Sequence, residues 1–431
     1  MRSSSEILRG LEQFGIRLGL ENLAGLLDEI GRPDEGMPAV LVAGTNGKGS
    51  TATLVAAIAG AAGYRVGLYT SPHLEEVEER IRVDFARIAP DRLADHLEEV
   101  LAAAARRDAP PPTYFEAVTV AAFLEFRRAG VDLAVLEVGM GGRLDATNIV
   151  APVLSVISSV ALDHREFLGD TLDAIAREKA GIMRPDVPVV LSPQVPEAER
   201  ALVEEATRIG AALVPVGPRL RKLELRSQGL AGIELDLSTD GRTYTLTCPL
   251  AGEHQAANVA TALVAAEELA RLGWDQIDEA AISEGIAQAR WPGRLEPVAL
   301  PDGQGTVLLD AAHNPTGCEA LARFVASLGR SYRLLFGALA DKEIEGMLPL
   351  LAAGADAVVL TRPPSPRAAE PADLARLVAP GLPVRIETEV ERALDLALDG
   401  YPELLVVCGS IFLVGEVRAS LRRRFGVPDA P

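Results

Sequence analysis

The chain has 431 residues, of which 48% are hydrophobic, and this length predicts two domains rather than one core. The formal net charge of −19 is spread along the chain, which argues against general binding to nucleic acid or to an acidic membrane. Any polyanionic ligand must therefore be held by a local group of cations, backbone N–H groups and metal. Three widely spaced cysteines and a start without an apolar leader segment favour a cytoplasmic protein with reduced thiols.

Strands and helices alternate along the first two thirds of the chain, which predicts an α/β fold with a mainly parallel sheet. A buried strand at 38–43 runs into a glycine-rich loop, and the apolar run 51–64 predicts the buried helix that follows. That run is too short to cross a bilayer. Further strands are expected at 64–70, 131–138, 153–160 and 187–192, and helices at 114–129 and 171–183.

Residues 222–250 change character, because apolar and polar residues alternate around glycine turns. This pattern predicts a small antiparallel segment appended to the sheet. Two helices are expected next, at 254–272 and 276–289, before the Pro-Gly interruption in WPGRLE. A second strand–helix alternation then begins at 306–310. We therefore predict a large N-terminal domain 1–293 and a C-terminal α/β domain 294–431.

The loop in VAGTNGKGST (42–51) is a candidate phosphate site that departs from the common G-x-x-x-x-G-K-[ST] pattern. Gly44 stands three residues before Gly47, and Gly49 separates Lys48 from Ser50. A strand, a glycine loop, a lysine and a helix N-terminus in this order direct backbone N–H groups and positive charge at one point. A glycine-rich turn with a solvent-exposed lysine is the alternative, and the complete order of elements favours phosphate binding.

Four of the five histidines lie in short polar segments at predicted strand ends, whereas His96 lies in an ordinary amphipathic helix. The four segments are TSPHL, LDHREFLG, GEHQAAN and DAAHNP, which contain His73, His164, His254 and His313. This clustering favours a shared polar cleft. The histidines lack the spacing of a zinc site and no cysteine accompanies them, so Mg²⁺ is the better candidate metal.

Glu137 is the candidate carboxylate for that metal, since it closes the apolar strand VDLAVLE where an unpaired charge is costly. Ligands of open α/β sheets bind at the carboxyl ends of parallel strands, which favours a functional Glu137 over a solvent-exposed one. Lys179, in contrast, has only the pattern of a charged residue on an amphipathic helix.

The chain resembles the folylpolyglutamate synthases and bifunctional dihydrofolate synthases of the Mur ligase superfamily. The resemblance spans residues 16–415 and rests on segments that occur in the family's order, namely GTNGKGS, TSPHL, TYFEAVT, EVGMGGRLDATN, LDHREFLG, EKAGI, PGRLE, HNP and CGS. The extra glycine after Lys48 is the family's own form of the loop. The resemblance implies that 1–293 is a P-loop-type domain that binds ATP and folate, and that 294–431 is a Rossmann-like glutamate ligase domain.

The resemblance implies a set of roles for individual residues. ATP would be held by Thr45, Asn46, Gly47, Lys48, Gly49, Ser50, Asn258, Arg294 and Asp310. Mg²⁺, as two ions, would be held by Ser71, Glu137, His164 and a carbamylated Lys179. The pterin-bearing substrate would contact Ile16, Leu18, Thr113, Tyr114, Phe115, Glu116, Leu144, Asp145 and Ala146. The residues expected to act in catalysis are Lys48, His164, Lys179, Arg294 and His313.

The implied reaction is an ATP-dependent addition of L-glutamate to folates, and to dihydropteroate in a bifunctional enzyme, through an acyl phosphate. The resemblance also implies a monomer that binds these small molecules in one-carbon metabolism. The alternatives are a ligase for a cell-wall nucleotide precursor, a GTPase-like switch or simple kinase, and a silent nucleotide-binding regulator. The chain departs from many relatives at Ala311-Ala312 and at Arg165, which puts only details of positioning in question.

Overall fold

The computed structural model describes residues 2–15, 17, 19–240, 242–400 and 403–426. The contacts divide the chain into two compact units. The first contains Met1–Glu224, Asp236–Leu246 and Ala257–Ala289, and the second contains Leu225–Leu235, Thr247–Ala256 and Arg290–Pro431. The domain boundary that we place after residue 293 from the sequence stays a prediction.

The first unit contains an eight-stranded sheet in which β2, β5, β1, β6, β7 and β8 are parallel. Strands β3 and β4 extend it in antiparallel fashion beyond β2. In sheet order the strands are β4 (Ala86–Arg87), β3 (Ile81–Val83), β2 (Val66–Tyr69), β5 (Leu133–Glu137), β1 (Ala39–Ala43), β6 (Pro152–Ile157), β7 (Pro188–Leu191) and β8 (Ala212–Pro215). The central strands are buried on both faces, as their continuous apolar sequences predict.

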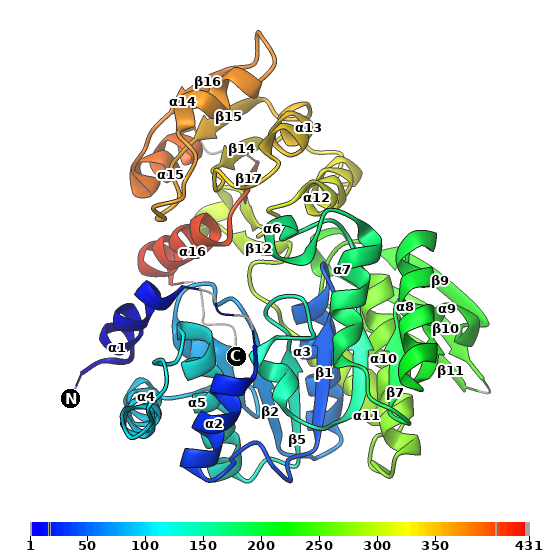
Figure 1. The fold of residues 1–431 in the computed structure, drawn as a ribbon. Coiled ribbons are helices and arrows are strands. Elements are labelled where there is room, and N and C mark those ends of the chain that lie inside the picture. Colours follow the sequence, from blue (N-terminus) through cyan, green and yellow to red (C-terminus); the bar gives the residue numbers. More distant parts are fainter. Residues whose placement is uncertain (1, 16, 18, 241, 401–402, 427–431) are drawn as a thin grey trace. The chain divides into compact units, whose positions relative to one another are not determined.

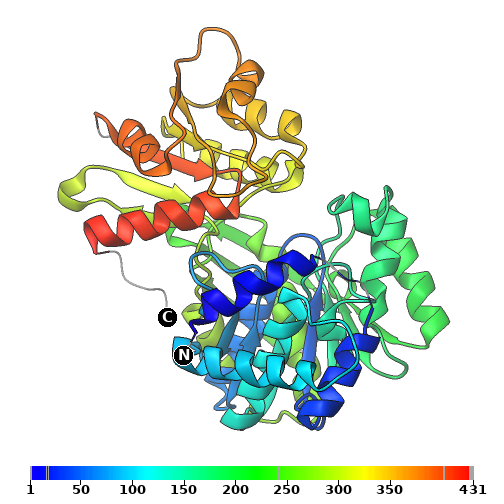
Figure 2. The same cartoon turned by 60° about the vertical axis from the view of Figure 1, so that its left-hand side comes forward.

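Helices cover both faces of this sheet (Figure 1). Alternate residues of β1, such as Leu41 and Ala43, join a core cluster with residues of α1, α2, α4, α5, α7 and α8. Helix α3 packs on β1, β2 and β5 and is in turn packed by α11. In Figure 2 the cyan helices α4 and α5 stand in front of the blue strands that they cover. The helices of this part of the chain are α1 (Ser4–Leu11), α2 (Glu21–Ile30), α3 (Lys48–Ala61), α4 (Pro90–Ala105), α5 (Tyr114–Ala129), α6 (Arg165–Leu168), α7 (Leu172–Lys179), α8 (Pro196–Ile209), α9 (Val216–Arg219), α10 (Gln255–Arg271) and α11 (Glu279–Gln288).

Residues 222–248 form a separate three-stranded sheet, which corrects the expectation that this segment is appended to the main sheet. Its order is β11 (Arg242–Cys248), β10 (Ile233–Thr239) and β9 (Lys222–Ser227). The connections between its strands are too short for parallel crossovers, so the strands are antiparallel. The short helix α9 separates β8 from β9, which ends the hydrogen-bonded ladder of the main sheet at β8.

The second unit contains a six-stranded sheet that is parallel except at one edge. Strand β12 begins at the last residue of WPGRLE and pairs with β13 in antiparallel fashion. The sequence pattern does not reveal this strand. In sheet order the strands are β12 (Glu296–Ala299), β13 (Thr306–Leu309), β17 (Leu404–Cys408), β14 (Arg333–Phe336), β15 (Ala357–Leu360) and β16 (Val384–Ile386). The helices are α12 (Pro315–Ser327), α13 (Leu348–Ala352), α14 (Pro371–Leu374), α15 (Val390–Leu398) and α16 (Ile411–Phe425).

All three cysteines are buried free thiols. Across the described ranges, no helix has the length and apolar character needed to cross a membrane.

Candidate active site

The glycine-rich loop connects β1 to the N-terminus of α3, which begins at Lys48. Two glycines are required by the backbone here. Gly44 has φ +146°, and a Cβ at this position would lie 1.9 Å from Oγ of Ser158. Gly47 has φ +85°, and its Cβ would lie 2.3 Å from Oδ1 of Asn258. The loop therefore passes close to β6 and to α10, and the structure brings the predicted nucleotide residue Asn258 beside it.

The first half of the loop is tied to the chain that follows β6. The backbone N–H groups of Thr45 and Asn46 both donate to the carbonyl of Ser159, at 2.7 and 3.2 Å. The hydroxyl of Thr45 donates to the carbonyl of Ala161 and accepts from the N–H of the same residue. These N–H groups already have acceptors, so the N–H groups available for a phosphate are those at the start of α3.

The start of α3 has the features of an anion site. The N-cap residue is Gly47, so no N-cap side chain satisfies the first-turn N–H groups of the helix. The ammonium group of Lys48 donates to the carbonyl of Thr45 at 3.1 Å, which places it over the loop. Gly49 and Ser50 follow in the buried first turn. A phosphate here would meet both the helix N-terminus and a lysine.

Glu137 and Ser71 form a buried pair of oxygen groups at neighbouring strand ends. Strands β2 and β5 are adjacent, so the TSPHL loop leaves β2 beside the end of β5. Glu137 is 4% exposed, and its Oε2 accepts the backbone N–H of Ser71 at 3.0 Å. The hydroxyl of Ser71 is buried and has no hydrogen-bond partner among the described residues. A carboxylate beside an unsatisfied hydroxyl is a donor set that fits Mg²⁺.

Lys179, the last residue of α7, is 4% exposed and lies directly against the glycine loop. Its ammonium group donates to the carbonyl of Gly44 at 2.7 Å. Burial, and then the charge of Lys48, lower the pKa of Lys179 from 10.5 to about 7. The sequence pattern alone suggests a surface position, and the structure shows a buried one; only the resemblance pointed to this site.

The lowered pKa makes stability depend on pH in a defined window. Between about pH 7 and pH 10.5 the unfolded chain binds more protons at Lys179 than the folded protein does. The free energy of unfolding of the wild type, relative to Lys179→Met, should therefore rise with pH across this window, by at most about 1.4 kcal/mol per pH unit. Urea denaturation in buffer free of metal and CO₂ measures this difference, with Lys222→Met at an exposed position as the control. A difference that stays flat over this window would contradict the assigned shift.

His164 precedes the short helix α6, with its backbone in the left-handed region at φ +50°. Its side chain is 44% exposed, and its Nε2 lies 3.8 Å from the carboxylate of Asp163. Within the described part of the chain, no group of three or more His, Cys, Asp or Glu residues is arranged to hold a metal ion. The structure thus joins Ser71 to Glu137 and Lys179 to the loop, while the four-ligand set stays a prediction.

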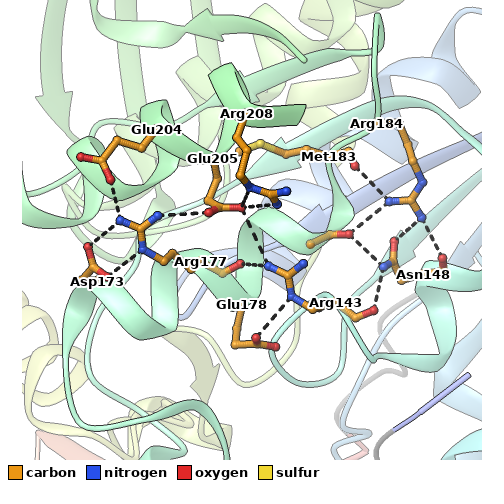
Figure 3. Close-up of polar contacts among 11 residues, drawn as sticks. Arg143, Asn148, Asp173, Arg177, Glu178, Met183, Arg184, Glu204, Glu205 and Arg208 are labelled. Carbon is orange, nitrogen blue, oxygen red and sulfur yellow. Dashed lines mark hydrogen bonds and ion pairs between the residues drawn. The ribbon is translucent and has the colours of Figure 1, made fainter. Parts of the chain in front are cut away.

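The segment 177–184, which carries Lys179, is hydrogen-bonded to the loop 139–148 that follows Glu137 (Figure 3). We call these contacts the clamp. The backbone N–H of Arg143 donates to the carbonyl of Glu178 at 3.0 Å, and its guanidinium donates to the carbonyl of Arg177 at 3.0 Å. Asn148 lies between Arg143 and Arg184. Its Nδ2 donates to the carbonyls of Arg143 and Gly181, and its Oδ1 accepts from Arg184 at 2.8 Å.

Glycines allow the two segments of this clamp to touch. A Cβ on Gly142 would lie 2.8 Å from the carbonyl oxygen of Lys179, and a Cβ on Gly181 would lie 2.3 Å from Cα of Arg143. The backbone around Lys179 therefore packs directly on the loop 139–148.

Asn148→Ala should lower the free energy of unfolding by about 2–3 kcal/mol, because it removes three half-buried hydrogen bonds, two donated by Nδ2 and one accepted by Oδ1 from Arg184. Arg208→Ala is the matched control. It removes an ion pair to Glu205 from a side chain that is 59% exposed, and we expect a loss below about 1 kcal/mol. Denaturant titration gives both values, and equal losses would show that the clamp contributes no more than a surface pair.

The predicted substrate segment 113–116 begins α5. Thr113 and Glu116 form a reciprocal capping box, so their polar groups hold the start of the helix. The ring of Tyr114 lies under the guanidinium of Arg80, whose central carbon is 5.3 Å from the ring centroid. Phe115 packs at 6.1 Å from the ring of Tyr69.

The second predicted substrate segment contains one exposed and two buried residues. The side chain of Leu144 is 39% exposed, whereas Asp145 and Ala146 are buried. The carboxylate of Asp145 accepts from the N–H groups of Met140 and Thr147, and burial raises its pKa. Asp145 therefore fixes the shape of the loop, and Leu144 offers an apolar contact. The predicted residues Ile16 and Leu18 lie outside the described residues.

In the second unit, Asp310 follows β13 and is buried. Its carboxylate accepts the N–H groups of Leu295 and Ala312, each at 2.9 Å. Burial raises its pKa, and the charge of Arg294 opposes this rise. His313 contacts the carbonyl of Ala311 through Nδ1 at 2.9 Å. The structure thus places Arg294 and Asp310 in one electrostatic group, and their contact with a nucleotide stays a prediction.

Two histidines have partners that sequence reasoning did not identify. Nδ1 of His73 accepts from Nε of Arg80 at 2.9 Å, and burial together with the Arg80 charge lowers the pKa of His73 to about 4. His96, expected to be ordinary, is fully buried and contacts Glu125 at 2.8 Å and Arg128 at 2.8 Å. Its interval from Glu125 exceeds any helical or strand period, so no local pattern could pair them.

These features define a class of α/β protein with a candidate anion site and a buried acid–hydroxyl pair at parallel strand ends. Residues 42–266 match the Mur ligase middle domain, and residues 293–411 match the Mur ligase glutamate ligase domain. The chain belongs to the folylpolyglutamate synthase/dihydrofolate synthase family of Mur ligases.

Two relatives show different lengths. The chain is 33% identical to the dihydrofolate synthase/folylpolyglutamate synthase of Bacillus subtilis over 96% of this chain and 97% of the relative. It is 36% identical to a probable bifunctional folylpolyglutamate synthase/dihydropteroate synthase of Halobacterium salinarum over 99% of this chain. It spans only about half of that relative, 52%. The similarity to the haloarchaeal protein therefore concerns one part of a longer chain.

Solved structures resemble the whole fold. The Escherichia coli FolC structure in complex with DHPP and ADP matches with a TM-score of 0.86 and 33% identity, over 98% of both chains. A Yersinia pestis folylpolyglutamate synthase/dihydrofolate synthase complexed with AMPPNP and Mn ion matches with a TM-score of 0.83 and 32% identity, over 98% of both chains.

Proposed function

We propose that this protein is an ATP-dependent ligase that joins L-glutamate to folates, and also to dihydropteroate. The observation that carries the proposal is the buried amine of Lys179 bonded to the carbonyl of Gly44, directly under the candidate phosphate loop. The relatives' names, and the ADP and AMPPNP with which the similar structures are complexed, support the choice of reaction.

ATP would be held at the start of α3, where Lys48 and the uncapped N–H groups meet its phosphates. Ser71 and Glu137 would hold Mg²⁺ together with His164 and Lys179. The resemblance implies that two such ions are bound. When bound, Mg²⁺ supplies electrostatic stabilisation for charge on the transferred phosphoryl group.

In the proposed reaction, an oxygen of the acceptor's carboxylate attacks the γ-phosphorus of ATP and ADP leaves, which gives an acyl phosphate. The α-amino nitrogen of L-glutamate then attacks the acyl carbon, an amide bond forms, phosphate leaves, and the amine loses a proton. Lys48 offsets negative charge during the first step. The roles of Arg294, Asp310, His313 and Asn258 remain those that the resemblance implies.

We also propose that Lys179 is carbamylated. Its pKa of about 7 leaves much of the amine uncharged near neutral pH, which is the form that reacts with CO₂. The nitrogen would form a bond to the carbon of CO₂ and release a proton, leaving an anionic carbamate. This change would turn a buried cation into an oxygen ligand beside Mg²⁺. Mass spectrometry of the intact protein under CO₂, after trapping of the carbamate by alkylation, should show the adduct on Lys179 and its loss in Lys179→Met.

The main alternative substrate is a cell-wall nucleotide precursor, as used by other Mur ligases. A substrate panel decides between them: ADP release with L-glutamate is measured with dihydropteroate, with a reduced folate and with a UDP-linked cell-wall precursor. We expect turnover with one or both pterin acceptors and none with the precursor. Turnover with the precursor alone would reject the folate assignment.

We further propose that the protein acts in the cytoplasm as a monomer on these small molecules, without nucleic acid. The net charge of −19 supports the last point, since a polyanion would be repelled. Light scattering after size exclusion should give the mass of one chain, and a concentration-independent dimer would contradict the monomer.

A further inference from the structure

Arg80 is a nearly buried cation that has no anionic partner among the described residues. It ends the short helix η2 (Val77–Arg80), directly before β3, and is 8% exposed. Its Nε donates to Nδ1 of His73 at 2.9 Å, and its guanidinium lies over the ring of Tyr114. In the ranges that the structure describes, no carboxylate lies within ion-pair distance of Arg80.

The two acidic residues of η2, Glu78 and Glu79, are hydrogen-bonded to other groups. Oε1 of Glu78 accepts from the hydroxyl of Ser4 at 2.7 Å. The carboxylate of Glu79 accepts three backbone N–H groups, those of residues 74, 75 and 76. Arg87, on the neighbouring strand, lies 3.8 Å from the carboxylates of both Glu76 and Glu79. Arg80 therefore differs from its neighbour in lacking a counter-charge.

A guanidinium cannot lose its proton in a protein, and a buried charge is costly unless it is paired. The contacts that Arg80 does make are to an uncharged ring nitrogen and an aromatic face, and these orient the group without neutralising it. A guanidinium held in this way is prepared to bind an anion, and its planar fork matches a carboxylate.

Arg80 also borders both parts of the candidate active site. His73 lies two residues after Ser71, whose N–H is bonded to Glu137. Tyr114 lies in the segment expected to contact the pterin-bearing substrate. An anion on Arg80 would thus lie between the candidate metal ligands and the start of α5.

We propose that Arg80, oriented by His73 and Tyr114, binds a carboxylate of the acceptor substrate. This inference rests on the proposed function, because that function supplies the carboxylate. Two carboxylates share this chemistry: the one that reacts, present in dihydropteroate and folates alike, and the α-carboxylate of a glutamyl tail, present only in folates.

Calorimetric binding of dihydropteroate and of a folate monoglutamate to Arg80→Met and Arg80→Lys tests the site. We expect the acceptor Kd to rise about 10–100-fold in Arg80→Met, the range of a lost charged hydrogen bond, and less in Arg80→Lys. The Kd of ATP should stay within about 2-fold. A rise for both acceptors assigns the reacting carboxylate, and a rise for the folate alone assigns the tail.

Arg87→Met is the matched control, since it removes a cation from the same region that already has acidic partners. Thermal unfolding checks that each variant is folded. If Arg80→Met is not folded, the acceptor Kd of Arg80→Lys tests the site. The inference is overturned if the acceptor Kd is unchanged, if Arg87→Met has the same effect, or if only L-glutamate binding weakens. Binding through Arg80 without any turnover would contradict the proposed reaction but not the site.

Discussion

Lys179→Met is expected to lower ADP-forming turnover by at least about 100-fold, the size of effect seen when a preorganised electrostatic group is removed from an active site. The physical reason is that the substitution removes the only buried amine that contacts Gly44 in the described structure, and with it the proposed carbamate ligand. Turnover at saturating ATP, acceptor and L-glutamate measures the loss.

The role of the carbamate can be separated from that of the amine. If the carbamate is required, removal of CO₂ should lower wild-type turnover, and short carboxylates such as formate should restore part of the turnover of Lys179→Ala. Lys179→Arg keeps a cation but cannot be carbamylated, so it should be as inactive as Lys179→Met. An active Lys179→Arg would contradict the carbamate and leave only a cationic role.

Glu137→Gln is expected to lower turnover by roughly 100-fold or more and to raise the Mg²⁺ concentration needed for half-maximal rate. Glutamine keeps the shape of the side chain and an oxygen that can accept the N–H of Ser71, so the fold should persist while the charge is lost. A Mg²⁺ titration of the rate separates the two effects.

Glu199→Gln, on the exposed face of α8, is the control for a lost carboxylate far from the loop. We expect it to match the wild type in both rate and Mg²⁺ dependence. If Glu137→Gln also matches the wild type, Glu137 is a structural residue and the proposed metal site is wrong.

The sequence predicts the main strands and helices because their signals are local. The expected strand at 38–43 is β1, and the helix expected at 114–129 is α5 with the same bounds. Strand β12 is missed because a short strand next to a Pro-Gly turn has too few residues to show a period. The prediction that β9–β11 extend the main sheet is wrong, because the alternation of apolar and polar residues indicates strands but not which sheet they join.

The candidate site divides in the same way. Gly44 and Gly47 can be singled out from the sequence, because glycine is the residue that readily adopts the positive φ found at both positions. The clamp through Asn148 and the site around Arg80 depend on groups brought together from distant segments. A run of polar residues gives no sign of which one will be buried without a counter-charge.

The central claim is tested most directly by the product formed from ATP, Mg²⁺, L-glutamate and either dihydropteroate or a reduced folate. Mass spectrometry of the acceptor and a parallel ADP assay follow the same reaction mixture. We predict one ADP released for each glutamyl residue added to the acceptor, and no sustained release when either L-glutamate or the acceptor is omitted. ADP release that continues without L-glutamate, or an acceptor that gains no glutamyl residue with either substrate, would contradict the account.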